Sequence, residues 1–276
     1  MIDGESRPSV KPRRPILRWH GGKWVLAPWI ISHFPKHRVY VEPYGGAGSV
    51  LMRKGRTYAE VWNDLDGEVV NLFRVLRGDR ADELVRQLRL TPFARDEFQL
   101  AHQPVEDSVE RARRTVIRSF MGFGSNAVHR PSGFRSNSNK SGTTPAHDWA
   151  NYPRALGAVI DRLRGVVIEN RDACEVMRAH DSPQTLHYVD PPYMPETRDT
   201  GSDYAHEMTT ADHERVLGVL KELRGNVVLS GYPSPLYDEA LAGWARHERK
   251  ALADGARKRT EVLWVKAAQP DIDLFS

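Results

Sequence analysis

The chain has 276 residues, of which 40% are hydrophobic and 28% charged, so it can bury a large α/β core and has the ordinary composition of a soluble globular protein. Its formal net charge of +4 and its pI of about 9.2 favour a nucleic-acid partner only slightly. The chain has a single cysteine, Cys174, which excludes a disulfide framework within the chain. It has no apolar run of the ~18 residues that a membrane span needs, and its N-terminus lacks the features of a signal peptide. These features favour a cytoplasmic protein.

Predicted strands and helices alternate along most of the chain. Residues 1–14 are polar and end in basic residues, which predicts a disordered basic arm. The β-branched or aromatic runs that predict strands are Val39–Glu42, Tyr58–Trp62, Val166–Glu169, Leu186–Val189, Asn226–Ser230 and Thr260–Val265. The segments of helical period between them are Val69–Leu76, Cys174–His180 and Thr210–Leu223. This alternation predicts a doubly wound α/β fold with a parallel sheet. Near the C-terminus, Trp244–Lys250 and Thr260–Lys266 predict an antiparallel pair at one sheet edge.

A region without convincing strands interrupts this alternation. Glu106–Met121 predicts a helix with Val109 and Val116 on its apolar face. The opposite face carries Arg111, Arg114 and Arg118. A loop-like, Gly-, Ser- and Asn-rich tract follows, Gly122–Thr144. We therefore predict a core of residues 15–76 and 162–267, an inserted helical lobe of residues 77–161 and a C-terminal tail of residues 268–276.

A compact turn precedes the first predicted strand. Trp19 is followed by a glycine pair and Lys23, in the segment Leu17-Arg18-Trp19-His20-Gly21-Gly22-Lys23. Such a turn can close over the carboxylate end of a ligand, with Lys23 facing it. By itself, the segment is more typical of a glycine turn that buries a tryptophan.

A glycine-rich loop follows the first predicted strand. Glu42 and Pro43 lead into Gly45, Gly46 and Gly48, which let the backbone approach a ligand at the start of the next helix. The spacing is not G-x-G-x-x-G, so an NAD site is a poor match. A smaller nucleoside without phosphates, such as S-adenosylmethionine, fits this loop better.

A carboxylate ends the second predicted strand. Asp64 lies 16 residues beyond Gly48, close to where α/β nucleoside binders place the carboxylate that accepts both ribose hydroxyls. The alternative is that Asp64 caps the helix that starts near Val69. Taken together, the glycine loop and Asp64 favour a ligand that contains ribose.

The most specific signal is Asp190-Pro191-Pro192-Tyr193, directly after the predicted strand Leu186–Val189. Asp190 is therefore expected at the carboxyl edge of the sheet, where open α/β folds bind ligands. The two prolines stiffen the loop and fix the directions of its carbonyl groups. The Asp190 carboxylate and the Pro191 carbonyl could then accept both N–H groups of an exocyclic amine, while Tyr193 offers a ring for a base to stack on.

In this order, the segments RWHGGK, EPYGGAGS, ND and DPPY resemble the Dam-like DNA adenine-N6 methyltransferases over about Ile16–Lys266. The resemblance implies a Rossmann-like, S-adenosylmethionine-dependent methyltransferase sheet with an inserted, mainly helical target-recognition lobe. The cofactor residues that it implies are Trp19, Lys23, Glu42, Pro43, Gly45, Gly46, Gly48, Asp64, Asp172 and Asp190, with Asp64 on the ribose and Asp172 on the cofactor adenine. The catalytic residues that it implies are Asp190, Pro191, Pro192 and Tyr193, acting on an adenine swung out of the duplex.

The inserted lobe is then expected to contact double-stranded DNA. The residues expected at this interface are Arg111, Arg114, Arg118, Asn126, Arg130, Arg135 and Lys140. Taken alone, the arginine face is more typical of a solvated surface. We expect a monomer without a metal ion, and a stand-alone phage, prophage or orphan bacterial enzyme.

Three other functions are compatible with parts of the pattern. An RNA or protein amide methyltransferase shares the fold, although such families generally have Asn in place of Asp190. A catalytically silent nucleic-acid-binding module would be expected to have lost one of the motifs. A dinucleotide-dependent oxidoreductase is disfavoured by the glycine spacing.

Two other segments have separate interpretations. Asp212-His213-Glu214 contains residue types that bind metals, but it is expected on an exposed helix that starts at Thr209 or Thr210. Met194–Met208 is expected to be a flap over the flipped base.

Overall fold

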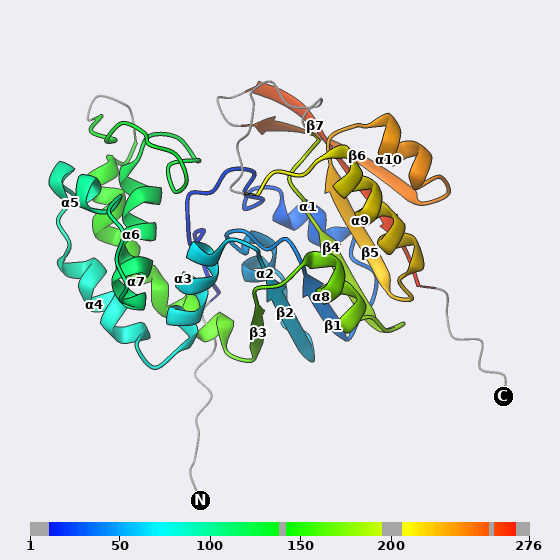
Figure 1. Ribbon diagram of the computed structural model, residues 1–276, viewed down its shortest axis with the longest axis horizontal. Coiled ribbons are helices and arrows are strands. Elements are labelled where there is room, and N and C mark those ends of the chain that lie inside the picture. The colour runs from blue at the N-terminus through cyan, green and yellow to red at the C-terminus, as the bar shows by residue number, and fades with distance from the viewer. Residues whose placement is uncertain (1–10, 138–141, 195–205, 254–256, 269–276) are drawn as a thin grey trace, which may run out of the picture.

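A seven-stranded sheet forms the centre of the computed structural model, which describes residues 11–137, 142–194, 206–253 and 257–268. The strand order is β3-β2-β1-β4-β5-β7-β6 (Figure 1). The strands are β1 Val39–Glu42, β2 Ala59–Asn63, β3 Val166–Glu169, β4 Thr185–Val189, β5 Asn226–Gly231, β6 Ala245–Ala253 and β7 Arg257–Lys266. Strands β1 to β5 pair in parallel, whereas β7 runs antiparallel to both β5 and β6. The predicted doubly wound α/β fold is confirmed.

The C-terminal strand pair lies at one edge of the sheet, as predicted. Strands β6 and β7 are antiparallel, as predicted. Strand β7 also pairs with β5, so β6 is the outer strand of this pair. The burial of Val262 and Leu263 in β7 agrees with the position of β7 between two strands.

Helices cover both faces of the sheet. Helices α1 (Ala27–Ser32), α2 (Ser49–Arg53) and α3 (Gly67–Arg77) contribute to one apolar cluster with Val228 of β5. Helices α8 (Ala173–Ala179), α9 (Thr210–Glu222) and α10 (Pro235–Ala240) share the other cluster with Val227 and Leu229. Neighbouring residues of one strand thus point to opposite layers, as the period of a strand requires. Helix α9 begins after Thr209, whose side chain accepts a hydrogen bond from the Asp212 N–H in a capping box.

The inserted region is helical, and its described residues form no strand. Helices α4 (Ala81–Leu90), α5 (Arg95–Leu100), α6 (Ser108–Met121) and α7 (Pro145–Leu163) make up this lobe, at the left in Figure 1. Helix α7 was not predicted, because Pro153 and Gly157 lie inside it and both residue types are usually unfavourable in a helix interior. Because α7 continues to Leu163, the lobe ends two residues later than the predicted boundary at residue 161.

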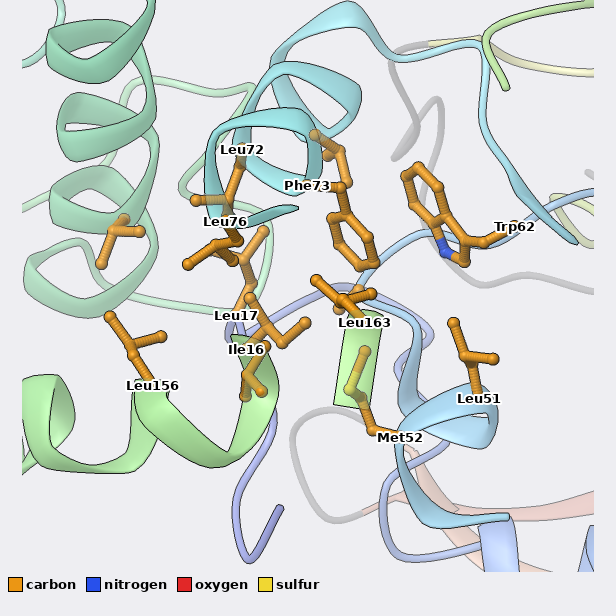
Figure 2. Packing of buried hydrophobic residues seen from close by; sticks show 14 of the residues in the cluster. Ile16, Leu17, Leu51, Met52, Trp62, Leu72, Phe73, Leu76, Leu156 and Leu163 are labelled. Carbon is orange, nitrogen blue, oxygen red and sulfur yellow. The ribbon is translucent and has the colours of Figure 1, made fainter. Parts of the chain in front are cut away.

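The lobe shares one apolar core with the α/β domain. Leu156 and Leu163 of α7 lie in the same cluster as Leu72 and Leu76 of α3 (Figure 2). Each of these side chains is at most 1% exposed. Burying a leucine contributes about 1.5–3 kcal/mol, so this shared core fixes the lobe against the sheet.

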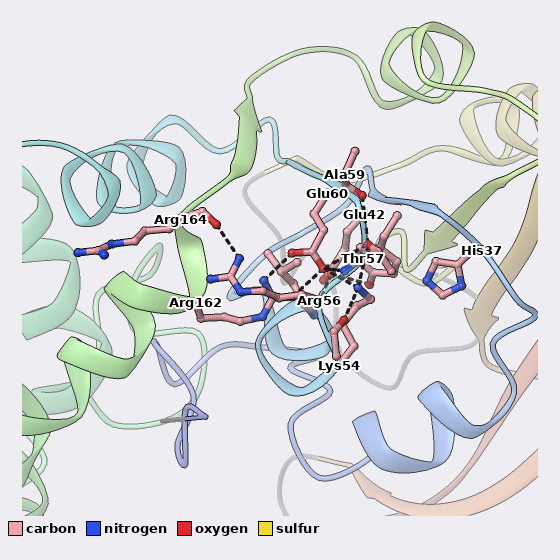
Figure 3. A network of polar contacts seen from close by, with 12 residues as sticks. His37, Glu42, Lys54, Arg56, Thr57, Ala59, Glu60, Arg162 and Arg164 are labelled. Atoms are coloured by element: carbon pink, nitrogen blue, oxygen red, sulfur yellow. Dashed lines mark hydrogen bonds and ion pairs between the residues drawn. The ribbon is translucent and has the colours of Figure 1, made fainter. Parts of the chain in front are cut away.

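A buried polar network also attaches the lobe (Figure 3). Glu60 of β2 accepts hydrogen bonds from the Lys54 ammonium at 2.6 Å and from the Arg162 guanidinium at 2.6 and 2.9 Å. Arg162 lies near the end of α7, so the network joins that helix to the sheet. All three side chains are at most 7% exposed, which makes the pairing of their charges necessary.

The N-terminal arm extends less far than predicted. Residues 1–10 lie outside the described residues, but Arg14 packs on the lobe. Its guanidinium lies 3.1 Å from the Asp148 carboxylate and 5.1 Å from the ring centroids of Phe120 and Tyr152. Arg14 therefore belongs to the ordered structure rather than to a disordered arm.

Candidate functional site

The four motifs meet at the carboxyl edge of the sheet. They lie where β1 and β4 are neighbours and the strand order reverses, which is where open α/β sheets bind ligands. A cavity of about 320 Å³ lies here. The segments that follow β1, β2, β3 and β4 all contribute to its wall, through Pro43, Asp64, Asp172 and Asp190 respectively. Parallel strands thus bring together residues that are up to 147 positions apart in the sequence.

The glycine loop has no room for side chains. A Cβ atom on Gly45 would lie 2.0 Å from Nε1 of Trp62, and one on Gly46 would lie 2.7 Å from Nε1 of Trp19. Gly46 also has a φ of +47°, which disfavours other residues. The loop is therefore closed between two tryptophans and presents its backbone to the cavity, as expected from the sequence.

Asp64 faces this loop. Its Oδ2 accepts a hydrogen bond from the Gly46 N–H at 2.7 Å, and its Oδ1 accepts one from the Asp66 N–H at 2.8 Å. Burial raises the pKa of Asp64 to about 6. The cap of α3 is Asp66, whose side chain accepts from the Glu68 N–H. The alternative role of Asp64 as the helix cap is therefore wrong.

Glu42 forms the buried end of the same loop. Its Oε2 accepts hydrogen bonds from the Tyr40 hydroxyl at 2.7 Å and from the Leu51 N–H at 3.1 Å. Burial raises the pKa of Glu42 to about 8. Glu42 also lines the cavity, where it lies with the residues of the glycine loop.

Asp172 has a partner that the sequence did not reveal. Its carboxylate caps α8 by accepting from the N–H groups of Cys174 and Glu175. Arg215 of α9 lies 2.8 Å from its Oδ2, and this guanidinium holds the pKa of Asp172 below its ordinary value. Both side chains line the cavity. Arg215 is 43 positions away from Asp172 on an amphipathic helix, so no local pattern marked it.

Asp190 is held from two sides. The hydroxyl of Ser230 on β5 donates to its Oδ1 at 2.7 Å, and the ammonium of Lys23 lies 3.0 Å from its Oδ2. Lys23 also donates to the Gly21 carbonyl at 2.7 Å and lies 3.6 Å from Glu261 Oε1. Lys23 was expected to face a ligand carboxylate, whereas it faces two carboxylates of the protein. Ser230 and Glu261 were not predicted, because they come from neighbouring strands.

Tyr193 is placed differently from the two prolines. Pro191 and Pro192 line the cavity, whereas Tyr193 is not among its described lining residues. The Tyr193 ring is 7% exposed, lies 4.7 Å from the Lys23 ammonium, and its hydroxyl donates to Glu261. Tyr193 is thus packed against Lys23 and Glu261, whereas a stacking ring on the cavity wall was expected.

The inserted lobe closes one side of the cavity through Ser125, Asn126 and His129. A turn holds this segment, because the Asn126 carbonyl accepts from the N–H groups of His129 and Arg130 at 3.2 and 3.1 Å. The His129 Nε2 lies 2.9 Å from Asp66 Oδ2. Asn126 was expected at DNA, whereas its amide atoms are buried at the cavity.

The arginines of α6 make intramolecular ion pairs. Arg111 and Arg118 lie 2.7 and 2.9 Å from the carboxylate oxygens of Glu68 on α3. Arg114 lies 2.7 Å from Glu110. The three arginines of this face are therefore paired with carboxylates of the protein and partly exposed.

The loop after α6 carries the other basic residues expected at DNA. Arg130 is exposed and Arg135 is half-buried, whereas Lys140 lies outside the described residues. Most of the expected flap also lies outside them, but its last residues, His206 to Met208, line the cavity.

The described ranges contain no group of three or more His, Cys, Asp and Glu side chains that is arranged to hold a metal ion. No helix in these ranges combines the length and the apolar composition that crossing a bilayer requires.

The model of the D12 class N6 adenine-specific DNA methyltransferase family matches residues 19–254. The chain is similar to a DNA adenine methylase of Haemophilus influenzae, with 24% identity over 92% of this chain and 94% of that protein. A DNA adenine methylase of Serratia marcescens is 33% identical, but that match spans only 39% of this chain and 41% of the relative. A solved structure of a putative methyltransferase from Escherichia coli aligns with a TM-score of 0.36 and 11% identity, over 89% of this chain and 84% of that one.

Proposed function

Because the chain belongs to the D12 class of N6 adenine-specific DNA methyltransferases, we propose that its cavity holds S-adenosylmethionine next to an adenine extruded from double-stranded DNA. The observation that carries this proposal is the position of Asp190. Its carboxylate lies on the wall of the cavity that also contains the glycine loop and Asp64. Methyl donor and acceptor would therefore meet in one enclosed space.

The residues of the cavity fit the proposed cofactor. Gly45 and Gly46 line the cavity, and neither carries a side chain that would keep a nucleoside away from the loop backbone. Each oxygen of Asp64 accepts one backbone hydrogen bond and retains a lone pair for a ribose hydroxyl. Asp172 would receive the exocyclic amine of the cofactor adenine. When bound, S-adenosylmethionine supplies a methyl group on a positively charged sulfur, which is a neutral thioether after transfer.

Asp190 would orient the exocyclic amine of the target adenine. Ser230 and Lys23 fix its carboxylate before the substrate arrives, so little reorganisation is needed during the reaction. We assign one N–H of the amine to Asp190 and the other to the Pro191 carbonyl, which leaves the nitrogen lone pair free to attack the methyl carbon. Pro192 keeps the loop rigid, since its φ is fixed. The methylated nitrogen is strongly acidic and then releases its extra proton to the Asp190 carboxylate that accepts its hydrogen bond.

DNA would reach the cavity over the inserted lobe. Arg130 and Arg135 lie in the loop that also carries the cavity residues Ser125 to His129, so phosphate contacts there would bring the duplex to the site. Arg111, Arg114 and Arg118 would have to leave their carboxylate partners to reach DNA. We therefore place the main DNA contacts on the loop, and we expect a monomer to act on DNA in the cytoplasm.

The test is transfer of a labelled methyl group from S-adenosylmethionine to unmethylated DNA, with single-base mapping of the product. N6-methyladenine in a fixed short context is expected. Asp190→Asn should lower the transfer rate by about 100-fold or more while leaving the affinity for S-adenosylhomocysteine within about tenfold. The matched control is Asp96→Asn on an exposed turn of α5, which should keep full activity. Label on RNA or protein instead of DNA would overturn the substrate, and binding without any transfer would indicate a silent module.

A further inference from the structure

We propose that the inserted lobe forms part of the cofactor site, with the Asn126 side chain binding the charged amino-acid end of S-adenosylmethionine. This inference rests on the proposed function, because it concerns the ligand of the same cavity. It assigns to the lobe a second task besides DNA contact.

The first observation is an amide without a partner. Both polar side-chain atoms of Asn126, Oδ1 and Nδ2, are buried, and neither has a hydrogen-bond partner among the described residues. Leaving such groups unpaired costs about 1–3 kcal/mol, so buried polar groups are nearly always paired in native proteins. Asn126 also lines the cavity. A ligand in the cavity is therefore the natural partner for both atoms.

The second observation is the location of Asn126 within the cavity. The turn that begins at Asn126 carries His129, whose ring packs edge-on against Trp19 with the centroids 5.2 Å apart. His129 also contacts Asp66, whose N–H binds Asp64. The turn is thus seated on the elements assigned to the cofactor, between the Trp19 turn and the proposed ribose ligand.

The chemistry of the amide selects one part of the cofactor. Asp64 accounts for the ribose and Asp172 for the adenine, so the zwitterionic amino acid remains. A zwitterion presents an acceptor carboxylate and a donor ammonium, which match the Nδ2 donor and the Oδ1 acceptor of a single amide. Lys23 had been the expected partner of the carboxylate, but its ammonium contacts Asp190 and lies near Glu261. The amide supplies the donor that the carboxylate then requires.

The experiment compares two ligands in calorimetric titrations without DNA. S-adenosylhomocysteine contains the amino acid, whereas 5′-methylthioadenosine keeps the adenine, ribose and thioether but lacks it. Asn126→Ala is expected to weaken binding of S-adenosylhomocysteine by about 10- to 100-fold, the range for hydrogen bonds to charged groups. Binding of 5′-methylthioadenosine should change by less than about twofold. Unchanged affinity for S-adenosylhomocysteine, or equal weakening of both ligands, would overturn the inference.

Two further variants test whether the amide itself makes this contact. Asn126→Asp keeps an acceptor for the ligand ammonium but replaces the Nδ2 donor by an oxygen that repels the ligand carboxylate, so it should bind S-adenosylhomocysteine more weakly than the wild type. Wild-type affinity in this variant would also overturn the inference. Asn151→Ala on an exposed turn of α7 is the matched control and should leave both affinities unchanged. Retained binding of 5′-methylthioadenosine shows that a variant is folded. If the wild-type chain binds neither ligand, the proposed function fails rather than this assignment.

Discussion

Asp64 and Glu42 flank the glycine loop, and burial raises the pKa of both carboxyl groups, to about 6 and about 8. A raised carboxyl pKa means that the folded protein favours the neutral form. The two groups therefore oppose folding increasingly as the pH rises from the pKa of the unfolded chain to that of the folded one. Ligand binding needs the opposite, because a ribose requires the acceptor form of Asp64.

The affinity for S-adenosylhomocysteine should consequently depend on pH through Asp64. As the pH falls from 7 to 5, Asp64 becomes protonated around pH 6 and loses an acceptor for the ribose hydroxyls. We expect about tenfold weaker binding at the lower pH, measured by calorimetric titration. Asp64→Asn should bind weakly at both pH values. A variant that keeps the wild-type pH dependence would show that another group is responsible.

The steric limit at Gly45 gives a second prediction. Trp62 stacks on Phe73 with the ring centroids 3.8 Å apart, so it cannot move away from a new methyl group. Gly45→Ala should lower the free energy of unfolding by about 2 kcal/mol, as overpacking of a core does, and this loss can be measured by urea denaturation. Gly55→Ala, with no atom within 4 Å of the added Cβ, is the control and should leave stability nearly unchanged. Equal stability of the two variants would contradict the close approach at the loop.

One glutamate makes most of the polar contacts between helices α3 and α6. Glu68 of α3 binds Arg111 and Arg118 of α6 and also accepts from the Thr115 hydroxyl. Arg118 further donates to the Ala101 carbonyl after α5. The arginine side of α6 thus organises the lobe, a structural role that its helical spacing alone did not distinguish from a DNA face.

The combined variant Arg111→Ala and Arg118→Ala separates these two roles. Because Glu68 is one-third exposed, we expect a loss of only about 1 kcal/mol in the free energy of unfolding. The salt dependence of DNA binding should stay unchanged, whereas Arg130→Ala should reduce its slope by about 1. If the double variant showed a weaker salt dependence of DNA binding with unchanged stability, α6 would be part of the DNA interface.

Across the whole molecule, the lobe is fixed to the sheet by the buried network of Lys54, Glu60 and Arg162 (Figure 3). Burial tends to raise the pKa of Glu60, but hydrogen bonds from Arg162 and Lys54 outweigh it, so the pKa is lowered overall. The stabilisation by this ion pair is therefore present at neutral pH and is lost as the pH falls through that lowered pKa.

Arg162→Met should lower the free energy of unfolding by about 3 kcal/mol, because it leaves Glu60 buried with one partner fewer. Urea denaturation at pH 7 measures this loss, which should shrink in acid as Glu60 becomes protonated in both proteins. Arg164→Met is the control, since the Arg164 side chain is 73% exposed. Equal midpoints for the two variants would show that the apolar core alone holds the lobe.

The sequence by itself determined the sheet, the four motifs and their common edge. Strand patterns such as Val39–Glu42 and Val166–Glu169 agree with the observed bounds, because both are short runs rich in β-branched residues. Once these strands are known, the order of a doubly wound fold places Asp64 and Asp190 at the same edge. The helices α5 and α7 were not predicted individually, since the short length of α5 and the internal Pro153 of α7 hide their period.

Only the tertiary structure decided which side chains complete the site. Arg215 on Asp172, Ser230 on Asp190 and the turn of Asn126 against the cavity join segments that are distant in the chain. Local propensity and periodicity describe a residue relative to its neighbours in sequence, so they carry no information on such contacts. For the same reason the charge of Lys23 suggested a ligand partner, whereas packing placed it against Asp190.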